Sequence, residues 1–444
     1  MKKIILLLCY VPYAAFGSAI DDCLNRKTVP TEKLSLPEII NLGLCRNPQT
    51  TAAYLSAESA RFQKNAGYAN YLPQVNASAS ASLPYRNQEW GDWSYGASLS
   101  ASYLIFDFGK RLADLNQLAA VWCATGFDYD ETVQSYVYGL IASYYSLLNA
   151  DADVNSASSL RAVAQTAKET AQKKFKAGAV AKADVLKAET TLATRDLELE
   201  RAKNNREIAK GTLLSKLSFP ANQNIEIADM PSEIGMPQEN ETIDELIATA
   251  EKKRPDLLRA TANKDAAWHR RNSVFLSNLP SISASGTLSW NDTPAESFGA
   301  GSDKISGSIG IRASMPIFAG FANMYGVRSA QANYERAIEQ ERATMDSAVL
   351  DIFTAYQNYK TAQTVLRQTQ TLLASATESE RVIAGMYKVG RATMLDWQTA
   401  QSDLVDAEKQ NNAAKYDLFT KRAAVALAIG DIKVQLEDGE NNND

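Results

Sequence analysis

The sequence contains few of the residue types that usually carry chemistry. Its 444 residues include four cysteines and a single histidine, His269. One histidine excludes a metal site built from several histidines and argues against a histidine-based catalytic triad. His269 stands beside two arginines and is predicted to be a polar surface residue. With no recognisable group of nucleophile, base and orienting residue, we predict no enzyme activity, no catalytic residue, no metal and no cofactor.

The sequence also lacks a large excess of either positive or negative charge. The chain has 46 Lys+Arg and 51 Asp+Glu, which gives a formal net charge of −5. This balance leaves no basic footprint for a nucleic-acid partner. The hydrophobic fraction of 45% and the length are sufficient for a sizeable core. Function is therefore expected to come from the architecture of the chain.

Long hydrophobic runs are absent beyond the N-terminus. A cationic start precedes an apolar run over residues 4–16, and small residues then lead to an acidic pair. This pattern predicts a secretory signal peptide over residues 1–19, with cleavage after Gly17 or Ala19. No later stretch reaches about 18 apolar residues, so any membrane segment would have to be built from strands.

A tandem repeat runs through the rest of the chain. Asn47-Pro48 matches Arg254-Pro255, and Tyr71-Leu72-Pro73 matches Asn278-Leu279-Pro280, both at an offset of 207. Further along the offset is 212, and the matching segments are Ile105-Phe106 with Ile317-Phe318, Phe175 to Gly178 with Tyr387 to Gly390, and Asp184 with Asp396. Such a repeat indicates a fold built from two copies of one unit.

The repeat sets the predicted domain boundaries. The first copy covers residues 20–220, a linker covers 221–241, and the second copy covers 242–430. The acidic, Asn-rich tail over residues 431–444 is predicted to be disordered. Each copy is expected to contain a helix, two strands, a long helix and a return helix.

The first helix of each copy is predicted over residues 37–70 and 243–278, with Ser35 as an N-cap. The long helices are predicted over 110–173 and 322–386, where proline is absent. Each of them would reach about 95 Å at 1.5 Å per residue. The return helices that follow carry mostly small and leucine residues at alternating spacings of four and three, with Arg195, Arg206 and Asn411 among them, which indicates a coiled-coil seam that is not wholly apolar.

The predicted strands alternate between apolar and polar residues with a period of two. They cover residues 75–83, 93–105, 282–288 and 305–317, with aromatic residues near their ends. Such strands are long enough to cross a bilayer when tilted. A soluble sandwich with one buried face would show the same alternation, so lipid and protein core remain alternatives for the apolar face.

The number of strands limits the architecture. Four strands cannot close a barrel, because about eight is the smallest closed number. Open sheet edges are not tolerated in lipid. If the strands span a membrane, several chains must therefore share one barrel, and the long helices then suit the wall of a projecting tube. A barrel continued by a tube would form a conduit.

Several motifs together resemble the TolC-type outer membrane factor family. They are the duplicated Asn47-Pro48 and Arg254-Pro255 positions, the two Leu-Pro strand entries, Phe106-Asp107-Phe108-Gly109, Pro316 to Gly320, and the two glycine-containing helix tips. The resemblance extends from about residue 34 to residue 430. It implies a mixed α and β fold, mainly α, in which each chain contains the duplicated repeat and three chains assemble into a homotrimer. The trimer would have a 12-stranded transmembrane β-barrel continued by a long periplasmic α-helical barrel.

The resemblance also implies a function and a location. The chain would be a passive exit duct in the outer membrane of a Gram-negative bacterium, a multi-pass β-barrel in outer membrane lipid with a periplasmic extension. Its partners would be a periplasmic adaptor (membrane fusion) protein and an inner-membrane transporter of the ABC or proton-driven type. The alternatives are type I protein secretion, which we favour slightly, multidrug or small-molecule efflux, and a non-conducting surface trimer with a coiled-coil stalk.

The N-terminal cysteines support that preference for protein secretion. Cys23 and Cys45 are close in sequence, and an exported chain favours disulfides, so we predict that they form one. Cys9 lies within the signal peptide without the small residue that usually precedes a lipid-attachment cysteine. A cysteine pair without a lipid anchor resembles the protein-secretion branch of the family.

Roles at the helix tips follow from the resemblance by position. Asp396 matches an aspartate of the constriction ring, Asp184 matches an acid of the closing network, and Tyr387 matches the tyrosine of that network. Thr399 stands where a second ring aspartate is expected, and the expected arginine appears one position early, as Arg391. Both departures affect how strongly the tip would close.

The physical properties of the tips leave two interpretations of the acids. Three copies of Asp396 on a symmetry axis would attract cations, and mutual repulsion would raise their pKa. Alternatively, Asp184 and Asp396 only stabilise the first turns of their helices. Gly178 and Gly390 are predicted to have positive φ. The candidates for contact with an adaptor are Lys176, Val180, Lys182, Lys388 and Val389. The alternative for each of them is an ordinary solvent-exposed turn residue without a partner protein.

Overall fold

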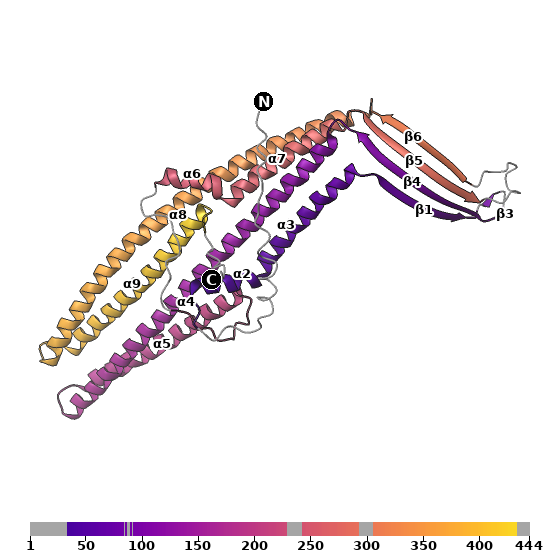
Figure 1. The fold of residues 1–444 in the computed structure, drawn as a ribbon. Coiled ribbons are helices and arrows are strands. Elements are labelled where there is room, and N and C mark those ends of the chain that lie inside the picture. The colour runs from indigo at the N-terminus through magenta and orange to yellow at the C-terminus, as the bar shows by residue number, and fades with distance from the viewer. Residues whose placement is uncertain are drawn as a thin grey trace, which may run out of the picture. The chain divides into compact units, whose positions relative to one another are not determined.

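The structure, a computed structural model, describes residues 33–83, 85–86, 89–90, 92–228, 242–292 and 305–432. The predicted signal peptide, most of the predicted linker and all but two residues of the predicted tail lie outside these ranges. Cys23 also lies outside them, so the structure does not test the predicted disulfide with Cys45. The described chain is mainly helical and contains one four-stranded sheet, in agreement with the predicted fold class (Figure 1).

The order of elements repeats along the chain. The first copy contains α2 (Leu36–Arg46), α3 (Pro48–Gly67), η1 (Tyr68–Tyr71), β1 (Gln74–Ser82), β4 (Ser94–Phe106), α4 (Lys110–Lys176) and α5 (Lys182–Lys216). The second contains α6 (Ile243–Lys253), α7 (Pro255–Leu276), β5 (Ser281–Asp292), β6 (Ile305–Ser314), α8 (Ala322–Lys388) and α9 (Met394–Ala428). A short hairpin of β2 (Tyr85–Arg86) and β3 (Glu89–Trp90) lies between β1 and β4 and was not predicted.

The chain divides into two compact units. One comprises the chain up to Ala53, Tyr129–Pro255 and the chain from Asp346 onward; the other comprises Tyr54–Asp128 and Asp256–Met345. We call the first the tip unit, because it contains the turns that follow α4 and α8. We call the second the sheet unit, because it contains β1, β4, β5 and β6.

The core of the tip unit forms where α2 packs against α4 and α5. Leu36 and Ile39 of α2, Leu140 of α4 and Leu213 of α5 are fully buried in one cluster. Gly43 permits this packing, since a Cβ there would lie 2.6 Å from Leu140 Cδ1. Ser35 occupies the N-cap position of α2 as predicted, and the Glu38 carboxylate accepts from its backbone N–H at 2.7 Å.

The predicted single first helix is wrong in both copies. It is broken at Asn47 and at Arg254, where ψ is 122° and 118°. Each of these residues precedes a proline, whose ring disfavours helical backbone at the position before it. The Asn47 side chain restarts the helix, because its Oδ1 accepts from the backbone N–H of Gln49 at 2.7 Å and of Thr50 at 3.0 Å.

Replacing Asn47 with alanine should destabilise the tip unit by about 1 kcal/mol, the usual cost of losing a helix cap. Asn47 is 7% exposed, so water replaces the lost acceptor poorly. Thermal unfolding followed by circular dichroism at 222 nm measures the change. Asn47→Asp retains the acceptor and should unfold near the wild-type temperature; equal loss in both variants would contradict the capping role.

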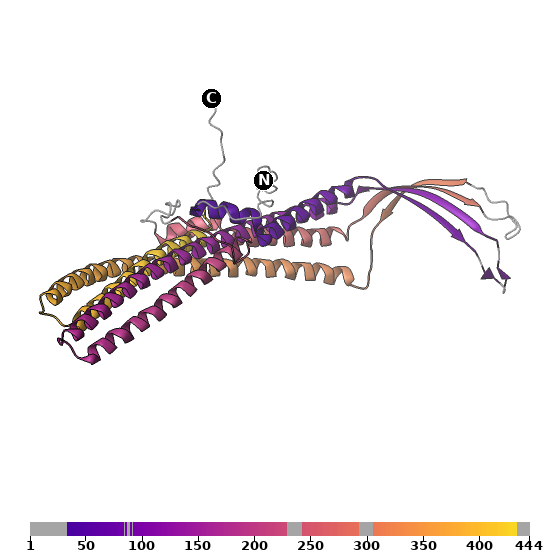
Figure 2. The ribbon, with the colours of Figure 1, turned by 90° about the horizontal axis from the view of Figure 1, so that it is seen from below.

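The two long helices have 67 residues each. They end at Lys176 and Lys388, slightly beyond the predicted ends, and at 1.5 Å per residue each is about 100 Å long. The predicted seam of the return helices is buried or half-buried, including Ala188 and Leu192 of α5 and Ala400 and Ala407 of α9. Figures 1 and 2 show α5 beside α4 and α9 beside α8, with both turns at the same end of the tip unit.

The sheet is antiparallel, in the order β1-β4-β5-β6. Leu104 and Phe106 flank a register shift in β4, where that strand approaches the helices. The last strand was predicted to reach residue 317 but ends at Ser314, because Pro316 has no N–H to donate to a ladder. Among the helices of the described ranges, none carries an apolar stretch that would let it span a bilayer.

Candidate functional site

The helix tips are two turns of the same design. Gly178 and Gly390 have φ values of +74° and +77°, as the sequence predicts. Ala179 N–H donates to Lys174 O and Arg391 N–H donates to Met386 O, at 2.9 and 2.8 Å, which ends each long helix in the manner of a glycine C-cap. A Cβ at either glycine would meet no atom within 4 Å. The backbone conformation, and not lack of space, therefore requires glycine.

Asp184 and Asp396 lie at the third positions of α5 and α9. The Asp396 carboxylate accepts from the Thr393 backbone N–H at 2.8 Å and from its hydroxyl at 2.6 Å. The Asp184 carboxylate accepts from the Ala181 N–H at 3.2 Å, and Ala181 has no hydroxyl to add a second bond. Both acids are thus helix caps within a single chain, and both are exposed to solvent.

The capping bonds shift the titration of Asp396. The Thr393 hydroxyl, followed by the Thr393 backbone N–H, holds the pKa of this carboxyl below its usual value. Asp396 is therefore fully ionised at neutral pH within one chain. Any raised pKa from repulsion between three copies would have to overcome these bonds.

An aromatic and charged cluster joins the two tips. The Lys174 ammonium donates to the Tyr387 hydroxyl at 3.2 Å and lies 4.6 Å from the centroid of its ring. The Tyr387 ring stacks on Trp397 with centroids 5.1 Å apart and planes at 18°. Trp397 Nε1 in turn donates to Glu380 Oε1 at 3.0 Å. We call these four residues the tip clasp.

The tip clasp gives Tyr387 a partner that the sequence did not indicate, Lys174. The resemblance places this tyrosine and Asp184 in one closing network; within the single chain Tyr387 binds Lys174 of α4, and Asp184 caps its own helix. The clasp ties the hairpin of α4 and α5 to that of α8 and α9 within the tip unit. Lys174 and Tyr387 are 213 positions apart, so periodicity could not have revealed the contact.

The other predicted tip residues lie on the surface. Thr399 is exposed and donates to Leu395 O at 3.0 Å, which uses its hydroxyl within α9. Arg391 is exposed in the turn before α9. The adaptor-contact candidates are exposed at Lys176, Lys182 and Val389 and half-buried at Val180, and the side chain of Lys388 lies outside the described part of the structure.

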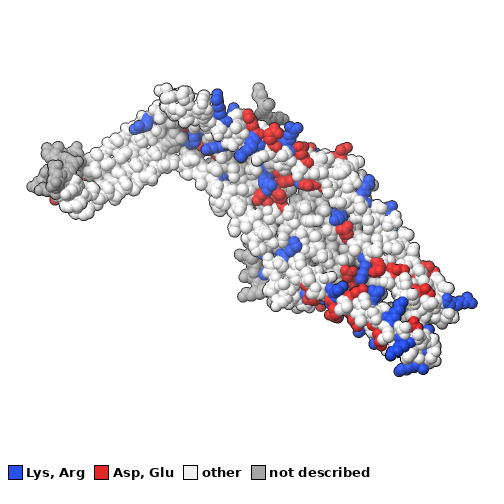
Figure 3. All heavy atoms as spheres, turned by 180° about the vertical axis from the view of Figure 1, so that it is seen from behind, with Lys and Arg blue, Asp and Glu red and all other residues white. Residues whose placement is uncertain are grey.

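The sheet has one apolar and one hydroxyl-bearing face. Ala77, Leu99, Leu288 and Gly307 pair in register across the four strands, and the next row consists of Ser78, Ser98, Ser289 and Ser306. The apolar side chains are uncovered, with Ile309 95% and Ile311 75% exposed. Figure 3 shows almost no charge on the visible face of the strands, while charged side chains are spread over the helices.

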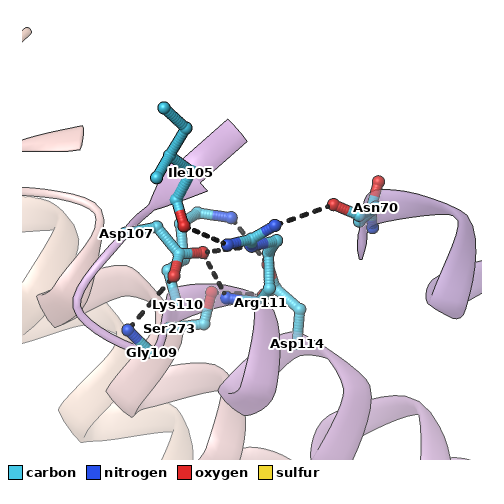
Figure 4. Close-up of polar contacts among 8 residues, drawn as sticks. All are labelled: Asn70, Ile105, Asp107, Gly109, Lys110, Arg111, Asp114 and Ser273. Atoms are coloured by element: carbon cyan, nitrogen blue, oxygen red, sulfur yellow. Dashed lines mark hydrogen bonds and ion pairs between the residues drawn. The ribbon is translucent and has the colours of Figure 1, made fainter. Parts of the chain in front are cut away.

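A compact polar cluster fixes the junction between β4 and α4 (Figure 4). Asp107 Oδ2 accepts from the backbone N–H of Arg111 at 2.8 Å and from its guanidinium at 3.1 Å. The guanidinium also donates to the carbonyls of Asn70 and Ile105, at 3.2 and 3.3 Å, and lies over the Tyr71 ring. The Asp107 and Arg111 side chains are only 9% and 11% exposed. We call this pair the junction lock.

The second copy has no equivalent lock. At the offset of 212, Asp107 corresponds to Ala319 and Arg111 to Asn323. Both copies turn into their long helix through two residues with positive φ, Phe108 and Gly109 in the first and Gly320 and Phe321 in the second, so the backbone turn is shared and only the ion pair differs. The junction lock thus distinguishes the copies, and the sequence motif Phe106-Asp107-Phe108-Gly109 indicates its position but not the ion pair.

The described ranges contain no group of three or more His, Cys, Asp or Glu residues arranged to hold a metal ion. His269 is half-buried, and this burial lowers its pKa. The features that stand out are therefore a two-faced sheet, two capped helix tips and the polar clusters that fix them.

Comparison with known proteins supplies a family. The family described as "Outer membrane efflux protein" matches residues 39–217 and 246–431, one match for each copy of the repeat. Protein CyaE of Bordetella pertussis is 23% identical over 92% of this chain and 86% of its own length. The outer membrane protein TolC of Escherichia coli is also 23% identical, over 98% of this chain and 88% of its own length.

Solved structures share the fold. The Campylobacter jejuni CmeC outer membrane channel superposes with a TM-score of 0.77 at 21% identity, over 93% of this chain and 92% of that one. The open state of the Neisseria gonorrhoeae MtrE outer membrane channel gives a TM-score of 0.76 at 18% identity, over 92% and 95%.

Proposed function

Because the chain belongs to the outer membrane efflux protein family, we propose that it is the exit duct of a tripartite export system. Three copies form the duct in the outer membrane. An adaptor protein in the periplasm connects the helical end to an inner-membrane transporter, and the duct conducts substrate passively. The energy and the choice of substrate reside largely with the transporter and the adaptor.

The observation that carries this proposal is the sheet. Its apolar rows are exposed and in register, and within the described residues β1 and β6 each have a neighbour on one side only. Lipid tolerates no open edge, so β1 of one copy pairs with β6 of the next. Three copies supply 12 strands, with the apolar face toward lipid and the hydroxyl face toward water.

The tips act as the gate in this proposal. Asp396 of each copy faces the axis and forms a ring of three carboxylates, while the tip clasp holds the two hairpins of each copy together. The Thr393 bonds that keep Asp396 ionised support a ring of negative charge at neutral pH. Such a ring concentrates cations at the entrance.

We propose that protein is the cargo rather than drugs or other small molecules. The absence of a lipid-attachment motif at Cys9 and the two cysteines that follow it, Cys23 and Cys45, support this preference. Deletion of the gene should then reduce the protein content of the culture medium and leave drug sensitivity unchanged. Unchanged protein export together with increased drug sensitivity would favour small-molecule efflux.

Purified protein in planar bilayers tests the duct and its gate together. We expect single-channel conductance that trivalent cations block from the tip side, and we expect Asp396→Asn to weaken the block about tenfold or more, since three charges are lost at once. Thr393→Ala is the matched control, because it removes the capping hydroxyl but keeps the ring charge. No conductance at all would contradict the duct, and an unchanged block in Asp396→Asn would contradict the gate.

A further inference from the structure

The hydroxyl-bearing face of the sheet is almost uncharged. Most of its positions on the four strands carry serine, and the others include asparagine, glutamine, threonine and glycine. Neighbouring hydroxyls bind one another, as Ser78 and Ser98 do at 2.8 Å. Hydroxyls and amides bind water and solutes of either sign, so this surface by itself does not select for charge.

Arg312 is the exception on this face. It lies on β6 between Ile311 and Ala313 of the apolar face, so the alternation of the strand places it among the serines. It pairs across the ladder with Ser283, two residues before β6 ends toward the helices. The residue is exposed. Among the described residues of the four strands, the other Asp, Glu, Lys or Arg is Asp292, at the far end of β5 and on the apolar face.

The acids at the helix end of the sheet already have partners of their own. Asp107 binds Arg111 within the junction lock. Asp114 binds Lys110 at 2.6 Å and also accepts from Ser273. These bonds occupy both carboxylates. Arg312 itself is exposed and forms no ion pair with another described residue, so its charge is available to solutes.

We propose that Arg312 makes the inner mouth of the barrel selective for anions. This inference rests on the proposed function, in which the hydroxyl face lines the lumen. Threefold symmetry then places three guanidinium groups at one level of the duct, where the other described residues on the hydroxyl face of the four strands are neutral. A guanidinium binds carboxylates and phosphates through paired hydrogen bonds, so the favoured solutes carry those groups.

The duct therefore carries two filters of opposite sign. The Asp396 ring at the tips attracts cations, and the Arg312 ring at the base of the barrel attracts anions. A solute with both charges, such as an unfolded polypeptide, meets an attractive ring at each stage. A small solute with a single charge is favoured at one ring and opposed at the other.

Reversal potentials in a KCl gradient measure this selectivity. The background is Asp396→Asn, which removes the tip filter, and low salt is used because the Debye length is about 30 Å at 0.01 M. We expect Arg312→Gln to lower the ratio of chloride to potassium permeability about twofold or more. Arg312→Glu should lower it further, and Arg312→Lys, the matched control, should remain near the parent value.

The outcomes separate this inference from the proposed function. Absence of conductance in all variants, the parent included, would overturn the duct itself. Normal conductance with equal reversal potentials for Arg312→Gln, Arg312→Glu and the parent would overturn the anion filter and leave the duct intact. A shift in Arg312→Lys as large as that in Arg312→Gln would show that packing, and not charge, is responsible, which would also overturn it.

Discussion

Tyr387→Ala is expected to raise the resting single-channel conductance of the duct several-fold. The variant removes the acceptor of the Lys174 ammonium, the aromatic face beneath it and the surface on which Trp397 stacks. These contacts connect the two hairpins of the tip unit. Without them the tips can separate, and a wider entrance conducts more ions.

The magnitude follows from the number of copies. An exposed cation–π contact contributes about 0.5–1 kcal/mol, and an aromatic stack contributes about 0.5–1.5 kcal/mol. If each clasp loses about 1 kcal/mol and three copies open together, the opening equilibrium shifts by about 3 kcal/mol, which is more than a hundredfold. The ratio of open to closed tips therefore rises by the same factor, and the mean conductance rises with it.

Graded variants locate the effect within the clasp. Tyr387→Phe keeps the ring and should raise conductance little, whereas Lys174→Met removes the charge and should have an intermediate effect. The double variant Lys174→Met with Tyr387→Ala should open no further than Tyr387→Ala alone, because the two residues share one interaction. Conductance of Tyr387→Ala equal to wild type would show that the clasp does not restrain the tips.

Most of the architecture could be predicted because its signals are local and repeated. The alternation that predicts the strands and the proline-free runs that predict the long helices are properties of neighbouring residues. Both patterns occur in each copy of the repeat. The cap at Asp396 could also be predicted, since Thr393 stands three positions before it. The helix breaks at Asn47 and Arg254 were missed although both residues precede proline, because apolar spacing continued across them.

The contacts that fix the site could not be predicted in the same way. Lys174 meets Tyr387 only after two hairpins are folded side by side, and no spacing rule connects residues so far apart. The junction lock is local in sequence, but the burial of Arg111 depends on Tyr71 and on the carbonyl of Asn70, which precede β1. Tertiary packing therefore determines which of the many charged residues are structural.

Asp107→Ala should destabilise the sheet unit by about 3–5 kcal/mol, because it leaves a buried guanidinium without its carboxylate. The Arg111 side chain is 11% exposed, and its other acceptors are two backbone carbonyls. The variant also removes the acceptor for the backbone N–H of Gly109 and of Arg111 at the start of α4. Urea unfolding in detergent, followed by tryptophan fluorescence, reports on the sheet because Trp290 lies on β5.

The second copy of the repeat suggests a double variant that should restore the stability lost in Asp107→Ala. Ala319 and Asn323 occupy the positions equivalent to Asp107 and Arg111, so Asp107→Ala combined with Arg111→Asn reproduces a junction that the chain already tolerates. The double variant should recover most of the lost stability, since it removes the unpaired charge. Lys110→Ala, which breaks a pair on the same helix whose lysine is 40% exposed, should cost less than about 1 kcal/mol. If the double variant were less stable than Asp107→Ala, the loss would come from the hydrogen bonds of Arg111 rather than from its buried charge.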